Sequence, residues 1–135
     1  DGIEHFARPV TLEDIAGLGR FDLMATGASA VSVDGVRFGK GHGFFDLEWG
    51  MFTDLGLALD TTPVAAIVHD VQVVEDHLQM SATDIPVDVI ATPGRLIHVA
   101  RPERRPRGIK WDLLSAQEIQ NIPPLRELAR MRGVA

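Results

Sequence analysis

The sequence predicts an α/β protein, because helix and strand signals alternate along the chain. Two apolar runs rich in β-branched residues, 64–68 and 87–91, are typical of short buried strands. Apolar residues at helical spacing follow a glycine-rich loop at 39–43. They predict a helix that precedes the strand at 64–68. We therefore expect strands covered by helices around one core.

The first elements are indicated by capping and turn signals. Residues 11–14 have the spacing of a capping box, so a short helix should begin there and end near Gly17 or Gly19. A strand is expected over 22–26. Residues 30–33 and 36–38 flank the Asp34-Gly35 dipeptide, which favours a β-hairpin with a two-residue turn and positive φ at both turn positions.

The later elements follow from periodicity and from proline. The helix after Gly43 should run for about three turns. The strand at 64–68 ends at His69-Asp70, the strand at 87–91 is followed by an extended piece at 96–99, and a second capping box lies at 115–118. That helix must stop before the prolines at 123–124, and a last helix should span 125–132, with Gly133 as its C-cap.

Composition is that of one folded domain. With 135 residues, 45% apolar and 24% charged, the chain supports a single domain over 1–135. No apolar run reaches the roughly 20 residues of a membrane span, no signal-like amino terminus is present, and no cysteine is available for disulfides, so we expect a cytoplasmic protein. Because residue 1 is aspartate, we expect a fragment or a processed chain.

Charge is distributed unevenly. Residues 1–94 carry 4 basic and 15 acidic side chains, whereas residues 95–135 carry 9 basic and 4 acidic ones. The basic, proline-containing stretch at 101–108 is expected to be a solvated loop. It could contact RNA through four arginines, but the absence of interleaved aromatics favours simple neutralisation of the acidic part, so nucleic acid is an unlikely partner. Those arginines are Arg101, Arg104, Arg105 and Arg107.

The loop between the hairpin and the helix is the main candidate site. Residues 35–46 combine glycines, which let a backbone approach an anion, with the cations Arg37 and Lys40 and a following helix amino terminus. The loop matches neither the Walker pattern nor the dinucleotide fingerprint. Phosphate binding and a purely structural tight turn are therefore both open from the residues alone.

Two aspartates are candidate metal ligands. Asp46 lies in the first turn of the expected helix, where a carboxylate either caps the helix or contacts Mg²⁺ beside a phosphate. Asp84, just before a strand, is the candidate second ligand. His69 at a strand end is better explained as a hydrogen-bonded turn residue than as a catalytic group, and the other histidines lack metal-ligand spacing.

The run at 37–46 resembles the arginine, glycine-rich, aromatic-aromatic-aspartate signature of the 5-formyltetrahydrofolate cyclo-ligase family, also called methenyltetrahydrofolate synthetase. The order of the motifs at 68–74 and 84–93 agrees with the closing half of that family. Residues 45–48, 67–70 and 108–111 resemble its divergent branch, the methenyltetrahydrofolate synthetase domain-containing proteins. The resemblance covers roughly residues 20 to 128 and depends on several ordered motifs.

The resemblance implies a Rossmann-like three-layer α/β sandwich, of which this chain is the carboxyl-terminal part. It also implies an ATP- and Mg²⁺-dependent ligase of one-carbon metabolism that closes 5-formyltetrahydrofolate to 5,10-methenyltetrahydrofolate. In that chemistry ATP phosphorylates the formyl oxygen, N10 attacks the activated carbon, and phosphate leaves. The positions that match the family give Arg37 and Lys40 as catalytic residues, Arg37, Gly39, Lys40, Gly41, His42, Gly43 and Phe45 as the ATP phosphate site, Phe44 as the folate contact, and Asp46 and Asp84 as the metal ligands.

Two departures from the family leave alternatives open. Phe44 and Phe45 stand where the family usually has tyrosines, so stacking is kept but the hydroxyl hydrogen bonds are lost. The family's amino-terminal half has no counterpart here, so we expect this chain alone to be inactive and its partner to be the missing segment of the same protein. The alternatives are a nucleotide- or phosphate-binding module with a regulatory or interaction role, and an RNA-associated domain.

Overall fold

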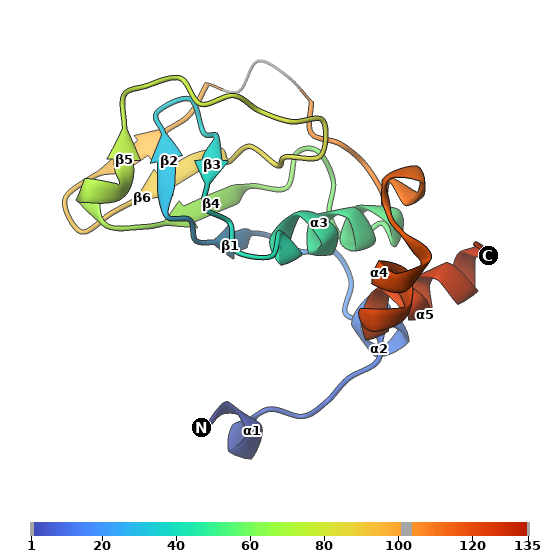
Figure 1. Ribbon diagram of the computed structural model, residues 1–135. Helices are drawn as coiled ribbons and strands as arrows, with labels where there is room; N and C mark the ends of the chain where they lie inside the picture. Colours follow the sequence, from blue (N-terminus) through green and yellow to red (C-terminus); the bar gives the residue numbers. More distant parts are fainter. Residues whose placement is uncertain (1, 101–103, 135) are drawn as a thin grey trace. The chain divides into compact units, whose positions relative to one another are not determined.

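The computed structural model describes residues 2–100 and 104–134, and these form two compact units. One unit is Arg20–Lys110, and the other combines the chain up to Gly19 with the chain from Trp111 onward. Figure 1 labels the helices and strands. The Arg20–Lys110 unit contains β1 (Met24–Thr26), β2 (Ala30–Ser32), β3 (Arg37–Phe38), α3 (Phe44–Asp54), β4 (Val64–Ile67), the 3₁₀ turn η1 (Asp70–Gln72), β5 (Val73–Val74), β6 (Val89–Ala91) and β7 (Leu96–His98).

The larger sheet has the strand order β1-β4-β6-β7. Strands β1, β4 and β6 are parallel, and β7 pairs antiparallel with β6. The mixed α/β architecture with a parallel sheet, expected from the alternating signals, is therefore confirmed and is consistent with a Rossmann-like cyclo-ligase fold. In such sheets ligands bind outside the carboxyl ends of the parallel strands. These ends are Thr26 of β1, Ile67 of β4 and Ala91 of β6.

A smaller sheet has the order β3-β2-β5. The expected β2–β3 hairpin is present. The prediction of a two-residue turn with two positive φ values was wrong. The Ser32 amide donates to Val36 O at 2.9 Å and the Gly35 amide to Ser32 O at 2.9 Å, so the loop contains the three residues 33–35. Only Gly35 has positive φ, at 88°, which is typical of a type I turn followed by a left-handed glycine. A Cβ on Gly35 would lie 2.6 Å from Val87 O, so the hairpin needs glycine there to pack against the segment before β6.

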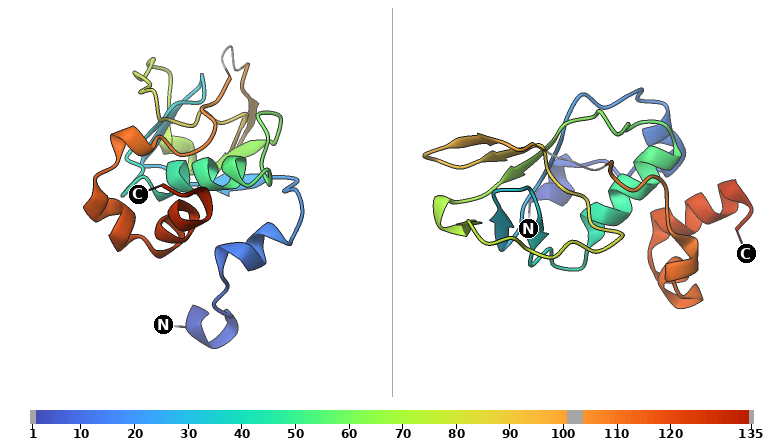
Figure 2. Two further views of the ribbon diagram at one scale, coloured as in Figure 1. Left: turned by 90° about the vertical axis from the view of Figure 1, so that its right-hand side faces the viewer. Right: turned by 90° about the horizontal axis from the view of Figure 1, so that it is seen from above.

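Helix α3 supplies the largest side chain of the core in this unit. Trp49 is 1% exposed and packs in one cluster with Val31 of β2, Val64 of β4 and Ile90 of β6. The helix begins where the apolar spacing predicted and runs for three turns. Figure 2 shows α3 and the two sheets from two further directions. The same packing fixes the amino end of α3 beside the loop that follows β3.

The other unit is helical, with α1 (Ile3–Phe6), α2 (Leu12–Ala16), the 3₁₀ turn η2 (Trp111–Leu113), α4 (Ala116–Asn121) and α5 (Pro123–Arg132). Both capping boxes are confirmed, at Thr11 and Ser115, as is the left-handed C-cap at Gly133. The Glu127 carboxylate accepts the amide of Leu12 at 3.0 Å, which joins α5 to the start of α2. None of the described helices has both the length and the apolar character of a membrane-spanning segment.

Candidate functional site

The loop after β3 has a left-handed glycine at each of three alternate positions. Gly39, Gly41 and Gly43 have φ values of 64°, 65° and 70°. A Cβ on Gly39 would lie 2.4 Å from the Ser29 side chain, whereas a Cβ on Gly41 or Gly43 would meet nothing within 4 Å. Gly39 is therefore required by packing, and the later part of the loop is open to solvent.

The amino end of α3 is free of side-chain caps. Gly43 is the N-cap residue and supplies no side-chain acceptor. Its carbonyl accepts the amides of Asp46 at 3.1 Å and Leu47 at 3.3 Å, while the amides of Phe44 and Phe45 have no acceptor within the described residues. Two unpaired amides at the positive end of an eleven-residue helix favour an anion at this position.

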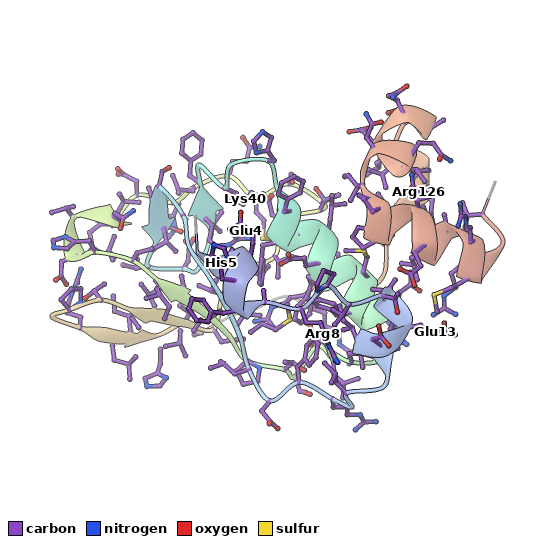
Figure 3. All side chains as sticks on the ribbon, turned by 90° about the horizontal axis from the view of Figure 1, so that it is seen from below. Glu4, His5, Arg8, Glu13, Lys40 and Arg126 are labelled. Atoms are coloured by element: carbon purple, nitrogen blue, oxygen red, sulfur yellow. The ribbon has the colours of Figure 1, made fainter. Side chains whose placement is uncertain are left out.

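The structure brings Asp46 and Asp84 together. Lys40 Nζ donates to Asp46 Oδ2 and to Asp84 Oδ1, so one ammonium joins both carboxylates. Figure 3 labels Lys40 between β3 and the amino end of α3. The Ser81 amide donates to the other oxygen of Asp84 at 2.7 Å and fixes its orientation. The three side chains are between 12% and 19% exposed, so the group lies at the surface but is largely shielded.

Arg37 holds Asp46 from the protein side. One guanidinium nitrogen, Nη2, donates to Asp46 Oδ1 at 2.7 Å, and Nη1 donates to Thr26 Oγ1 and Gly27 O, both at 3.3 Å. The guanidinium also lies 4.7 Å from the centre of the Phe45 ring, and the Arg37 side chain is only 2% exposed. Arg37 therefore links Asp46, a candidate metal ligand, to the carboxyl end of β1.

Charge partners favour the ionised forms of Lys40 and Asp84. Burial raises the pKa of Asp84, but hydrogen bonds from Lys40 and from the Ser81 amide outweigh it and hold that pKa below its ordinary value. Burial lowers the pKa of Lys40, but the hydrogen bonds and charges of Asp46 and Asp84 raise it above its ordinary value. Burial lowers the pKa of Arg37 despite the nearby carboxylates, and an arginine stays charged nonetheless.

The two phenylalanines have different surroundings. Phe44 is 53% exposed and stacks on His42 with ring centres 5.4 Å apart. Phe45 is half-buried, packs against the core of this unit and lies under Arg37. Phe44 and His42 therefore offer an exposed aromatic surface beside the loop, whereas Phe45 faces the protein.

His69 is a turn residue, as the sequence indicated. Its Nδ1 accepts the Val71 amide at 3.3 Å, and its own amide donates to Gln72 Oε1 at 2.6 Å. These two bonds form the capping box of η1 at the end of β4. The preference for a hydrogen-bonded turn histidine over a catalytic one is consistent with this geometry.

Arg105 corrects the expectation of a solvated basic loop at 101–108. Its side chain is 0% exposed and donates to Pro86 O at 2.8 Å, to Thr62 O at 3.0 Å and to the Asp88 carboxylate. Its guanidinium also lies 4.9 Å from the centre of the Trp49 ring. Arg105 is therefore a buried structural residue and is unavailable to RNA; among its neighbours, Arg104 and Arg107 are exposed, and Arg101 lies outside the described residues.

The candidate metal ligands at the site are the two carboxylates of Asp46 and Asp84. Within the described residues, no group of three or more His, Cys, Asp or Glu side chains gathers in a way that could hold a metal ion. Asp46 and Asp84 nevertheless converge on one positive charge, the Lys40 ammonium. Mg²⁺ commonly takes one or two protein carboxylates and completes its shell with phosphate oxygens and water, so the donor set fits Mg²⁺ bound together with a phosphate.

Comparison with known proteins decides the family. The model of the 5-formyltetrahydrofolate cyclo-ligase family matches residues 6–93. This chain belongs to that family. The match includes the loop after β3 and the residues that converge on Lys40.

Curated relatives support the same family. The chain is 40% identical to the methenyltetrahydrofolate synthase domain-containing protein of Mus musculus, over 94% of this chain and 34% of that protein. It is 38% identical to the proteins of the same name from Danio rerio, over 99% of this chain and 35% of the relative, and from Homo sapiens, over 94% and 33%. The chain thus spans about a third of the length of these relatives. The resemblance to this branch of the family is confirmed.

Proposed function

We propose that the loop after β3 and the amino end of α3 bind the phosphates of ATP, with Mg²⁺ held by Asp46 and Asp84. The observation that carries this proposal is the convergence of both carboxylates on the Lys40 ammonium beside a helix terminus with unpaired amides. A polyphosphate at this position would meet backbone amides, Lys40 and the metal together.

The backbone amides, Lys40 and Arg37 would act on the phosphates in different ways. The amides of Gly41, His42, Phe44 and Phe45 would face the phosphate oxygens, and Lys40 would contact them as a catalytic cation. Arg37 would act through Asp46, because its guanidinium is already engaged inside the protein. Asp46 and Asp84 would hold Mg²⁺, which when bound would supply positive charge against the negative charge that develops during phosphoryl transfer. No protein nucleophile is needed, since phosphoryl transfer depends on positioning and charge neutralisation.

The exposed aromatic surface is the proposed folate contact. Phe44 is half exposed beside the loop, so its ring could pack against the pterin of a reduced folate. With ATP and 5-formyltetrahydrofolate at adjacent positions, the complete protein would carry out the cyclo-ligase reaction, ring closure to 5,10-methenyltetrahydrofolate. The exposure of Phe44 and the family membership of the chain support this assignment.

The direct test of catalysis uses the full-length protein, ATP, Mg²⁺ and 5-formyltetrahydrofolate. We expect the absorbance of methenyltetrahydrofolate to rise only when all four components are present. An Asp84→Asn variant should fold normally and give a much slower rise. Folded protein that gives no rise with saturating Mg²⁺ and ATP would reject the cyclo-ligase reaction.

A second candidate is a nucleotide-binding module without turnover. The observation that favours it is the absence of hydroxyl groups at Phe44 and Phe45, where the family usually has tyrosines. Calorimetry distinguishes the two functions. ATP binding that is unchanged by a reduced folate, in a protein that produces no methenyltetrahydrofolate, would favour the binding module.

A further inference from the structure

Lys40 already fills the position at which the two candidate metal ligands meet. Its ammonium contacts one oxygen of Asp46 and one of Asp84. The two carboxylates thus face the Lys40 ammonium in the way that they would face a shared metal cation. In this structure the chain therefore supplies its own positive charge to the carboxylate pair.

The charges of the site balance in this arrangement. Arg37 and Lys40 contribute two positive charges, and Asp46 and Asp84 contribute two negative charges. A divalent cation that approached alone would meet carboxylates already neutralised, and it would be repelled by the ammonium between them. A polyphosphate that approached alone would find no uncompensated positive side chain. The two ligands together remove both obstacles, because the phosphate can take Lys40 while the metal takes the carboxylates.

Lys40 is held through its ammonium alone and is partly exposed, whereas Arg37 is held by three partners inside the protein. Lys40 lies between Gly39 and Gly41, both in the left-handed region, and its flexible side chain is 19% exposed. The Arg37 side chain is 2% exposed and donates to Thr26 and Gly27 as well as to Asp46. A displaced Lys40 ammonium would remain beside the amino end of α3, where a phosphate is proposed to bind.

We infer that the Lys40 ammonium occupies the position between Asp46 and Asp84 and prevents a divalent metal from binding there. The metal can bind only after a phosphate has replaced the carboxylates as the partner of Lys40. This inference rests on the proposed function, because it assigns an order of binding at the same site. It predicts that Mg²⁺ enters with the nucleotide and not before it. It also assigns Lys40 two successive sets of partners, first the carboxylates and then the phosphate.

The test measures Mn²⁺ binding without nucleotide, by calorimetry or by the spin-resonance signal of free Mn²⁺. Lys40→Gln should bind Mn²⁺ at least about tenfold more tightly than the unmodified protein, because one positive charge leaves the immediate surroundings of the metal. Lys110→Gln is the matched control, since Lys110 is the other lysine of the chain and is exposed. It should bind Mn²⁺ as the unmodified protein does. Equal Mn²⁺ affinity in Lys40→Gln and the unmodified protein would overturn the inference.

A second measurement needs no variant at the site. Because the chain has two lysines, protein labelled with ¹³C-lysine gives two side-chain Cε resonances, which Lys110→Gln assigns. Mg²⁺ alone should leave the Lys40 resonance in place, and Mg²⁺ with a non-hydrolysable ATP analogue should shift it. A bound analogue that leaves this resonance unmoved would contradict the inference. If no nucleotide binds, the proposed function fails, and the Mn²⁺ comparison still decides whether Lys40 holds the carboxylates closed.

Discussion

Replacing the buried Arg105 by methionine should strongly destabilise the protein. Methionine keeps much of the apolar stem but removes the guanidinium, which is 0% exposed. The change deprives Pro86 O and Thr62 O of donors at 2.8 and 3.0 Å and leaves the Asp88 carboxylate without its arginine partner. Asp88 keeps the Val64 amide as a donor at 2.9 Å, so it stays in place beside β6.

The size of the effect follows from breaking a buried ion pair on one side, which costs about 3 to 5 kcal/mol in general. We expect the lower end, about 3 kcal/mol, because the Asp88 side chain is 28% exposed and water can solvate part of its charge. In a domain of this size such a loss lowers Tm by about 10 °C or more.

The assay is urea denaturation followed by the combined fluorescence of Trp49 and Trp111. Trp49 lies beneath the Arg105 guanidinium. Arg104→Met is the matched control, because Arg104 is exposed and its replacement should change stability by no more than about 0.5 kcal/mol. If Arg105→Met unfolds at the same urea concentration as Arg104→Met, the buried arginine does not stabilise the fold in the way described.

Three further predictions concern the loop and its ligands. Gly39→Ala should cost more stability than Gly41→Ala in urea denaturation, because both substitutions add about 1 to 2 kcal/mol of left-handed strain but only the first meets Ser29, at 2.4 Å; equal midpoints would refute this difference. The folded-state pKa of Asp84 is depressed, so its contribution to stability is present above the ordinary value of 3.8 and lost as pH falls through the folded pKa. Asp84→Asn should therefore flatten the acid limb of the stability profile, and an unchanged limb would contradict the assignment. Phe44→Ala should weaken binding of a reduced folate at least about tenfold while ATP affinity stays within about threefold, since the ring is 53% exposed and available to stack on a pterin; calorimetry with equal losses for both ligands would count against its role.

Much of the fold could be predicted from local chemistry. Both capping boxes, the left-handed glycine after α5 and the helical spacing after Gly43 specify elements through contacts between near neighbours in sequence. The turn of the hairpin was the exception. Asp34-Gly35 suits either a two-residue turn or the end of a three-residue turn, and the pairing of Ser32 with Val36 selects the second.

Strand β5 and Arg105 had no usable local signal. The strand has two residues and exists because Val73 pairs with Val31 of β2. The acceptors of Arg105 include the backbone carbonyls of residues 60, 62 and 86. Every residue has a backbone carbonyl, so the residue type does not indicate which carbonyls accept these bonds. Both features depend on which distant segments meet, which single-residue chemistry does not determine.

The candidate site was predictable in composition but not in geometry. The glycines, Lys40 and Asp46 lie within one short stretch, so their proximity follows from the sequence. The meeting of Asp84 with Lys40 does not, because the segment that carries Asp84 has no regular structure and is placed partly by the Val87–Gly35 hydrogen bond. Family resemblance supplied the pairing that spacing alone left open.

The most direct test of the central claim is nucleotide affinity with and without Mg²⁺, measured by calorimetry for the unmodified protein and for Asp84→Asn. We expect Mg²⁺ to tighten binding of an ATP analogue by about tenfold or more in the unmodified protein, a coupling of ordinary size between two ligands. Asp84→Asn should lose most of that enhancement, and its metal-free affinity should stay the same or rise, because Lys40 loses one compensating carboxylate. The same Mg²⁺ enhancement in both proteins would show that the carboxylate pair joined by Lys40 does not hold the metal.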